Sequence, residues 1–216
     1  MHKKIFALTM ILLLVMLAVA ACAEKPSDSG STEGVAGDGA TERNGKDPAE
    51  EQTEIPAPKK QYIDMDLMVV GSGTGNVPLQ IWKAGDTAGA KFKADFTVTE
   101  VDVVCPSFTN EDAVMAFKLY KWDTDYETTV AAEPIWIDTE TGYHYEENTA
   151  IIFEIEDGIA PAGTYLWLLE GVSSTPGMWS ETDAEPGGDP DVVFYHYGKV
   201  TNNCIISSVH GYTMTE

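Results

Sequence analysis

Between residues 61 and 216, apolar and polar residues alternate at a spacing of two in almost every run that carries large side chains. In the segment 115–122, Met115, Phe117 and Leu119 fall on one face of an extended chain, while the other face carries polar and aromatic side chains. Successive side chains of a strand point to opposite sides, so this period predicts β-strands with one buried face. No run shows the spacing of an amphipathic helix. The pattern therefore favours an all-β fold.

Ten such segments are rich in Val, Ile, Phe, Tyr and Trp, and Gly, Pro, Asn or Asp stand in the gaps between them. Short strands at this spacing are typical of β-sandwiches and barrels. We therefore expect residues 61–216 to form one domain, a jelly-roll-type β-sandwich that is long enough to bury a core. The predicted strands are residues 62–70, 77–82, 90–98, 101–108, 113–122, 134–138, 150–156, 163–170, 192–197 and 203–209.

The N-terminus has the order of an export signal. A short basic start with Lys3 and Lys4 precedes an apolar stretch from residue 5 to residue 21, which is the pattern of a cleaved signal peptide. The closing Leu-Ala-Val-Ala-Ala-Cys22 resembles a bacterial lipobox, at which the cysteine is acylated. The resemblance implies a lipoprotein with signal peptide 1–21 and acyl chains, such as palmitate, on Cys22. Two or more chains suffice for stable membrane anchoring. An ordinary secreted protein and a retained membrane anchor are the alternatives.

Residues 22–60 have a different composition from the rest of the chain. They are rich in Gly, Ser, Thr, Glu, Asp and Pro and contain no aromatic residue. Such a segment cannot bury enough apolar surface to offset the entropy lost on ordering. We expect a disordered acidic linker that holds the domain away from the lipid, on the extracytoplasmic side of a bacterial cell membrane. Ala23 stands where some lipoproteins carry an aspartate that retains them in the inner membrane.

The charge of the expected domain narrows the partners that it can have. Of the 35 Asp and Glu residues 26 lie in residues 61–216, against 6 of the 13 Lys and Arg residues, and none of these is Arg. Nucleic-acid binding needs Lys and Arg to neutralise phosphates, and docking on anionic lipid needs them too. The charge balance therefore argues against both partners for the domain. The acidic excess is typical of a soluble surface, and calcium or a cationic partner is the alternative.

Aromatic residues beside polar ones give the main indication of a binding site. A sugar ring has an apolar C–H face and a rim of hydroxyls, so its site combines flat aromatic rings with hydrogen-bonding side chains. Trp179 lies in Pro176-Gly-Met-Trp-Ser-Glu-Thr-Asp183, which reads as a loop. The residues predicted to bind a ligand are Trp122, Tyr126, Trp179, Glu181 and Asp183. The three aromatic residues among them belong to a wider group of aromatics that lie at strand ends and in polar loops. This group also includes Tyr120, Trp136, Tyr143, Tyr145, Tyr195 and Tyr197.

Asp123 and Asp125 have the alternate spacing of oxygen ligands in a calcium loop. An EF-hand is excluded, because Thr128 stands where that loop needs Gly and Pro134 where it needs Glu. A structural calcium site of another kind is one interpretation of the pair. A turn between two strands, with its acids facing water, is the other.

Cys105 and Cys204 each lie inside a predicted strand. Disulfides persist in exported proteins, and an early strand and the last strand of a jelly roll often lie side by side. A bridge between the two cysteines is therefore one alternative, and two buried free thiols are the other.

No motif of a known catalytic or nucleotide site occurs in the chain. Gly-x-Ser-x-Gly, His-Glu-x-x-His and Cys-x-x-Cys are all missing. The glycine-rich segment 71–78 has its third glycine at the wrong offset for dinucleotide binding, and a strand rather than a helix is expected after it. We expect a protein that is not an enzyme. A small hydrolase with a pair of carboxylates remains an alternative, because such a pair is recognised by its separation in space.

Several short motifs resemble, in their order, a known kind of domain. They are Phe96-Thr-Val98, Phe117-Lys-Leu-Tyr-Lys-Trp-Asp-Thr-Asp-Tyr126, Val130-Ala-Ala-Glu-Pro134, Ala160-Pro-Ala-Gly-Thr-Tyr-Leu-Trp167, Pro176-Gly-Met-Trp179 and Pro186-Gly-Gly188. Over about residues 91–204 the order resembles jelly-roll accessory domains of bacterial glycoside hydrolases and surface lipoproteins, which are similar to galactose-binding-like sandwiches. The resemblance implies carbohydrate binding through loop aromatics and a structural calcium ion. It assigns no ligand residue individually.

These observations together predict a membrane-anchored lipoprotein whose β-sandwich binds carbohydrate or another extracellular ligand without catalysis. A module that binds another protein of the cell envelope through its acidic surface is the alternative function.

Overall fold

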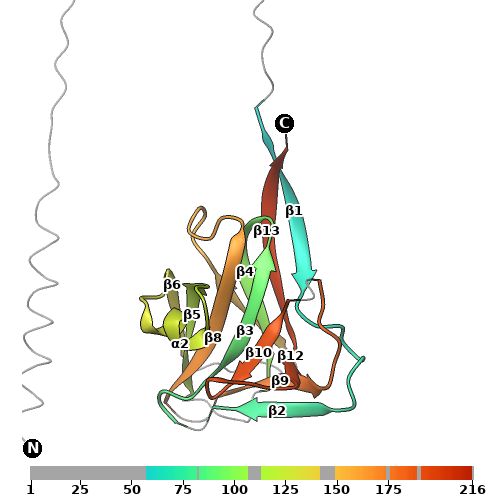
Figure 1. The fold of residues 1–216 in the computed structure, drawn as a ribbon, viewed down its shortest axis with the longest axis vertical. Coiled ribbons are helices and arrows are strands. Elements are labelled where there is room, and N and C mark those ends of the chain that lie inside the picture. The colour runs from blue at the N-terminus through green and yellow to red at the C-terminus, as the bar shows by residue number, and fades with distance from the viewer. Residues whose placement is uncertain are drawn as a thin grey trace, which may run out of the picture. The chain divides into compact units, whose positions relative to one another are not determined.

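The alternating segments form strands in the computed structural model (Figure 1), which describes residues 57–81, 83–106, 113–141, 149–173, 176–188 and 191–215. The signal peptide 1–21, the lipid site Cys22 and nearly all of the linker 22–60 lie outside the described residues. The strands are β1 (Lys59–Asp66), β2 (Asn76–Gln80), β3 (Thr87–Ala94), β4 (Thr97–Cys105), β5 (Val114–Lys121), β6 (Trp136–Thr141), β7 (Thr149–Glu154), β8 (Gly163–Ser173), β9 (Gly177–Thr182), β10 (Val193–His196), β11 (Lys199–Val200), β12 (Asn203–Ile205) and β13 (Ser207–Thr215).

Two antiparallel sheets pack face to face. The four-stranded sheet has the order β1-β13-β4-β7, and the six-stranded sheet has the order β11-β10-β3-β8-β5-β6. Their inner rows share one apolar core, in which Phe117 of β5 stacks on Phe153 of β7 with ring centroids 4.7 Å apart. Trp167 of β8 is fully buried in the same core. The predicted all-β sandwich is thus confirmed, and the last strand β13 lies between β1 and β4, as jelly-roll-type connections allow.

A third, three-stranded sheet of order β12-β9-β2 lies at one end of the sandwich, at the bottom of Figure 1. Residue Ile206 joins this sheet to the four-stranded one: its N–H donates to the carbonyl of Trp179 at 2.9 Å, and its carbonyl accepts from the N–H of Val104 at 3.0 Å. The third sheet therefore closes the end of the core with Leu79 and Met178.

A short helix, α2 (Tyr126–Ala131), interrupts the strands where the sequence predicted only a turn. Asp125 is its N-cap, because the Asp125 Oδ1 accepts a hydrogen bond from the Thr128 N–H at 2.8 Å. The side chain of Thr129 is buried and donates to the Asp125 carbonyl at 2.6 Å. The helix has six residues, too few for helical periodicity to show, so the capping residue was its main sequence signal.

Cys105 and Cys204 are free and buried, so of the two alternatives left open by the sequence the structure has two thiols and not a bridge. Cys105 ends β4, whereas Cys204 lies in β12, which pairs with β9. The Cys204 Sγ points at the Ala184 carbonyl, 3.4 Å away. Burial raises the pKa of both thiols, which makes them poor nucleophiles.

In the part of the chain that the structure describes, no helix is long and apolar enough to cross a membrane.

Candidate functional site

Three aromatic rings lie together on the outer face of the six-stranded sheet. The ring centroid of Tyr195 is 4.8 Å from that of Tyr126 and 6.4 Å from that of Trp122. We call Trp122, Tyr126 and Tyr195 the aromatic surface. None of the three is in the main core: Tyr195 belongs to a small cluster on the outer side of the sheet, and Trp122 and Tyr126 pack against it while half-buried. Trp122 and Tyr126 thus keep part of their surface open to solvent, whereas Tyr195 is buried beside them.

Each ring comes from a different element, and a shared apolar base holds them in place. Trp122 follows the end of β5, Tyr126 is the first residue of α2, and Tyr195 lies in β10. The base is formed by Leu166 and Leu168 of β8, whose side chains point away from the main core. Burying rings on leucines is favourable, and paired aromatic rings add about 0.5–1.5 kcal/mol beyond that. The surface is therefore preformed.

Two open hollows flank Tyr126, and both reach Gly198. The larger, of about 480 Å³, lies over the aromatic surface. The smaller, of about 330 Å³, also has Tyr126 in its lining. Residues that line the larger hollow include Trp122, Thr124, Asp125, Glu127, Tyr195 and Lys199. Residues that line the smaller one include Asp86, Thr87, Lys118, Tyr120, Glu170 and Tyr197.

Polar and charged groups surround the rings. The Lys91 Nζ lies 5.1 Å from the centre of the Trp122 ring, within the range of a cation–π contact. Lys118 and Glu170 form an ion pair across β5 and β8 in the smaller hollow. The Tyr126 hydroxyl lies 3.3 Å from the Thr87 Oγ1. Flat rings with hydrogen-bonding groups at their rim are the combination that a sugar ring requires.

The protonation states at this site follow from burial and hydrogen bonding. The backbone N–H of Thr128 lowers the pKa of the Asp125 carboxyl, which therefore stays ionised. Burial raises the pKa of the Tyr120 and Tyr195 hydroxyls above the ordinary value for tyrosine, so both remain hydrogen-bond donors at neutral pH. The two hollows beside the aromatic surface thus contain tyrosine hydroxyls as donors and the Asp125 carboxylate as an anionic acceptor.

The structure brings together only part of the predicted ligand set. Trp122 and Tyr126 lie on the aromatic surface, while Trp179, Glu181 and Asp183 lie on or just after β9 of the three-stranded sheet. The prediction of a loop around Trp179 is wrong, because β9 pairs with β2 on one side and β12 on the other. Trp179 is only half-buried there, and it lies apart from the other two rings.

Glu181 and Asp183 have structural roles in the end sheet. The buried Glu181 carboxylate accepts hydrogen bonds from the N–H of Gly71 at 2.7 Å and of Gly73 at 3.0 Å. It thereby fixes the glycine-rich loop that precedes β2. Asp183 has a φ of 55° and its Oδ1 accepts from the Asn202 Nδ2 at 2.7 Å. Both carboxylates are therefore used within the fold.

Asp123 and Asp125, the predicted calcium ligands, are exposed beside the aromatic surface. Asp125 caps α2, and the Asp123 Oδ1 accepts from the Thr124 hydroxyl at 3.0 Å. Among the described residues, the side chains whose ligand atoms are close enough to share an ion are Glu100, Asp102 and His210, on the other large sheet. The calcium prediction at Asp123 and Asp125 stays a prediction.

Tyr195 is the residue of this surface that the ligand prediction missed. It lies in the wider group of aromatics beside polar residues. Nothing in its local sequence shows that β10 pairs with β3, or that only β8 separates β3 from β5. The strand order alone brings Tyr195 next to the helix that follows β5.

No protein-family model matches this chain, and neither a curated protein nor a solved structure shows significant similarity to it.

Proposed function

We propose that this protein is a non-catalytic binding protein, whose β-sandwich recognises carbohydrate with the aromatic surface of the six-stranded sheet. The observation that carries the proposal is the grouping of Trp122, Tyr126 and Tyr195 along an open hollow that also contains Asp125 and Glu127. A pyranose ring stacks its C–H face on such rings and places its hydroxyls among the rim groups.

The smaller hollow extends this site. It shares Tyr126 and Gly198 with the larger hollow, and it carries the ion pair of Lys118 and Glu170 together with the exposed Tyr197. Both ion-paired side chains keep about a quarter of their surface exposed, so they are free to bond to hydroxyl groups. Two adjoining hollows suit a chain of at least two sugar units better than a single monosaccharide.

The ionised Asp125 suits binding better than acid catalysis. A glycosidase needs one carboxyl group that stays protonated near neutral pH, and this requires a raised pKa. At the aromatic surface the pKa of Asp125 is lowered instead, and its oxygen already caps a helix. A lipid on Cys22 and a spacer up to the start of β1 at Lys59 would display this domain outside a bacterial cell.

Glycan-array binding of the full-length chain tests the proposal, followed by calorimetry with the best oligosaccharide. Trp122→Ala and Tyr195→Ala should each weaken binding by about tenfold or more, since central aromatic residues carry most of the affinity of a binding site. Tyr62→Ala is the matched control, because Tyr62 is 77% exposed on β1 of the other sheet. Affinity that survives both aromatic substitutions, or no saturable binding on the array, would overturn the proposal.

A further inference from the structure

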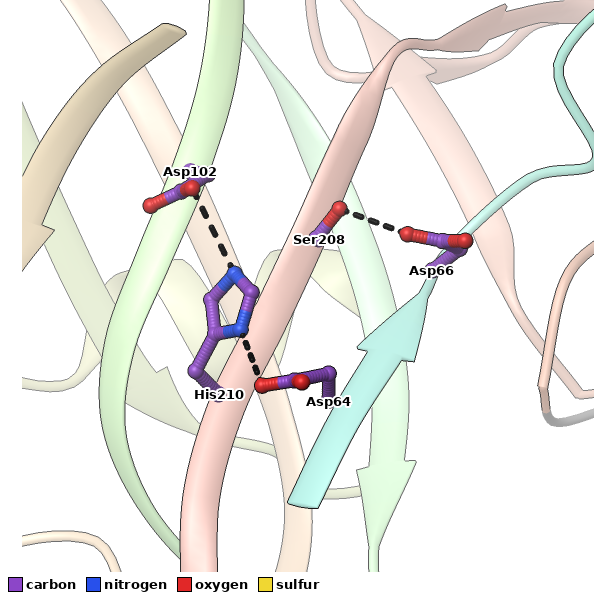
Figure 2. Close-up of polar contacts among 5 residues, drawn as sticks. All are labelled: Asp64, Asp66, Asp102, Ser208 and His210. Carbon is purple, nitrogen blue, oxygen red and sulfur yellow. Dashed lines mark hydrogen bonds and ion pairs between the residues drawn. The ribbon is translucent and has the colours of Figure 1, made fainter. Parts of the chain in front are cut away.

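His210 lies among carboxylates on the outer face of the four-stranded sheet (Figure 2). It is in β13, between β1 and β4, and its direct cross-strand neighbours are Asp64 on one side and Glu100 on the other. In the next row, Ser208 of β13 lies between Asp66 and Asp102 in the same way. A single imidazole is thus held between acids from two strands.

One nitrogen of His210 is oriented by a carboxylate. The Nδ1 lies 2.8 Å from the Asp64 Oδ1, and Asp64 is largely exposed. Because a carboxylate accepts hydrogen bonds, the Nδ1 carries the proton of this contact. The Nε2 of the neutral ring then presents a lone pair on the opposite side. A carboxylate that orients a histidine in this way is the usual outer partner of a metal-bound imidazole.

The Nε2 side of the ring faces Asp102 without a hydrogen bond. The distance from Nε2 to the Asp102 Oδ2 is 3.4 Å, longer than the 2.7–2.9 Å or so of a charge-assisted hydrogen bond. Within the described residues, the Nε2 and the Asp102 Oδ1 are both shielded from solvent and have no hydrogen-bond partner. Buried polar atoms without a partner are uncommon in folded proteins. The Nε2 and the Asp102 Oδ2 form a long ion-pair contact, and an ion bound between the imidazole and the Asp102 carboxylate would satisfy both groups.

The separation fits two ligands of one metal ion. Ligands placed about 2.0–2.1 Å from a tetrahedral zinc ion lie about 3.4 Å from each other. Glu100 supplies a third ligand atom, and the three atoms lie within 4.8 Å of one another. Small side-chain rotations of Glu100 would close the site around an ion. A solvent molecule could take the fourth position.

An irregularity of the sheet lies directly beside the pair of His210 and Glu100. The register between β13 and β4 shifts between His210 and Gly211, so that His210 pairs with Glu100 and Gly211 with Val98. Such bulges re-aim side chains and occur next to functional sites. At Gly211 a Cβ would come within 1.9 Å of the Thr97 carbonyl, so the bulge depends on a glycine at this point.

The negative charge of the acidic side chains around His210 also favours the binding of a cation. Glu100 and Asp102 lie two residues apart on β4, and their carboxylate oxygens lie within 4.8 Å of one another and of His210. Glu154, the direct cross-strand neighbour of Glu100 on β7, adds another negative charge to this face. A cation between these groups would offset their mutual repulsion.

We propose that His210, Asp102 and Glu100 form a binding site for one divalent transition-metal ion of the zinc type, with Asp64 as the residue that orients His210. An imidazole ligand suits zinc and its neighbours in the first transition row, whereas calcium takes six to eight oxygen ligands at longer distances. The ion joins the final strand β13 to β4.

Calorimetry with ZnCl₂ on the full-length chain, freed of metal by chelation and dialysis, tests this site. We expect one zinc ion per chain, no comparable heat with CaCl₂, and a cobalt-loaded form whose visible absorption is that of a tetrahedral ion. His210→Gln and Asp102→Asn should each lower the zinc affinity by more than about tenfold, and Asp64→Asn by about tenfold.

Two matched controls accompany these variants. Asp66→Asn removes the same charge from the same face, where the Asp66 Oδ1 accepts only from the Ser208 hydroxyl at 2.8 Å, and His196→Gln changes a histidine of the other sheet. Both should keep the zinc affinity within about twofold. Far-UV circular dichroism identifies any variant that fails to fold. If zinc does not bind saturably to the unaltered chain, or binds equally well to His210→Gln and Asp102→Asn, the proposal is wrong.

Discussion

The outer face of the six-stranded sheet carries aromatic rings on a leucine base, whereas the outer face of the four-stranded sheet carries carboxylates grouped around His210. On both sheets, the side chains of the opposite, inner face pack into the same core. On the first face, burial of ring against ring holds the side chains in place. On the second, like charges lie close together, and His210 or a cation is needed to offset their repulsion. The aromatic face is therefore preformed, while the acidic face would be completed by the proposed cation.

The largest effect is expected from a change that removes the support of both faces at once. Phe117→Ala deletes a ring that is fully buried between the two sheets and stacked on Phe153. The free energy of unfolding should fall by about 3–5 kcal/mol, measured by urea denaturation. Glycan and zinc binding should then weaken together as the temperature is raised. A loss below about 1 kcal/mol would show that the two sheets do not share this core.

The second prediction is a loss of stability that should leave ligand binding at both faces unchanged. Glu181→Gln leaves one of the two N–H groups of Gly71 and Gly73 without its carboxylate acceptor. We expect a loss of about 1.5–3 kcal/mol in unfolding free energy, with glycan and zinc affinities unchanged. Glu185→Gln is the control. Glu185 is exposed and lies three residues after the end of β9, so this substitution should leave the free energy of unfolding unchanged. Loss of glycan binding in Glu181→Gln would return this residue to the ligand site.

A third change distinguishes the two faces directly. Gly198 has a φ of +71°, and a Cβ there would lie 3.3 Å from the Tyr126 ring. Gly198→Ala should cost about 1–2 kcal/mol from backbone strain and should also weaken glycan binding by displacing Tyr126. Zinc binding should not change.

Gly158→Ala is the matched control for Gly198→Ala. Gly158 has a φ of +86° with nothing within 4 Å of an added Cβ, so it carries the same kind of strain without the aromatic neighbour. Equal glycan affinity in the two variants would mean that Tyr126 takes no part in binding.

The smallest effect concerns alkaline pH at the aromatic face. The pKa of Lys118 is raised, mainly by its hydrogen bond to Glu170, and burial raises the pKa of Tyr120 and Tyr195. In each case the unfolded chain releases its proton first, so stability falls as the pH rises from about 9 to about 11. Urea unfolding should show a smaller fall in Tyr195→Phe than in the unaltered chain. An equal or larger fall would contradict the assignment.

Local sequence was sufficient for the strands and for the sides of each strand. The alternation from Met115 to Leu119 correctly gave the core row of β5, because side-chain direction depends only on position along a strand. Local sequence was insufficient at Trp179. Pro176 and Gly177 suggested a loop there, although β9 pairs with a strand on each side. Pairing with distant strands overrode the local turn signal.

The sequence by itself determined that the chain forms a β-sandwich and that Trp122 and Tyr126 lie near its solvent surface. Only the tertiary structure decided that Tyr195 joins them, and that Asp64, Asp102 and His210 meet on three neighbouring strands. The physical reason is that periodicity records which side of a strand a residue faces and not which strand lies beside it. Strand order depends on how the whole core is packed, and both candidate sites are products of that order.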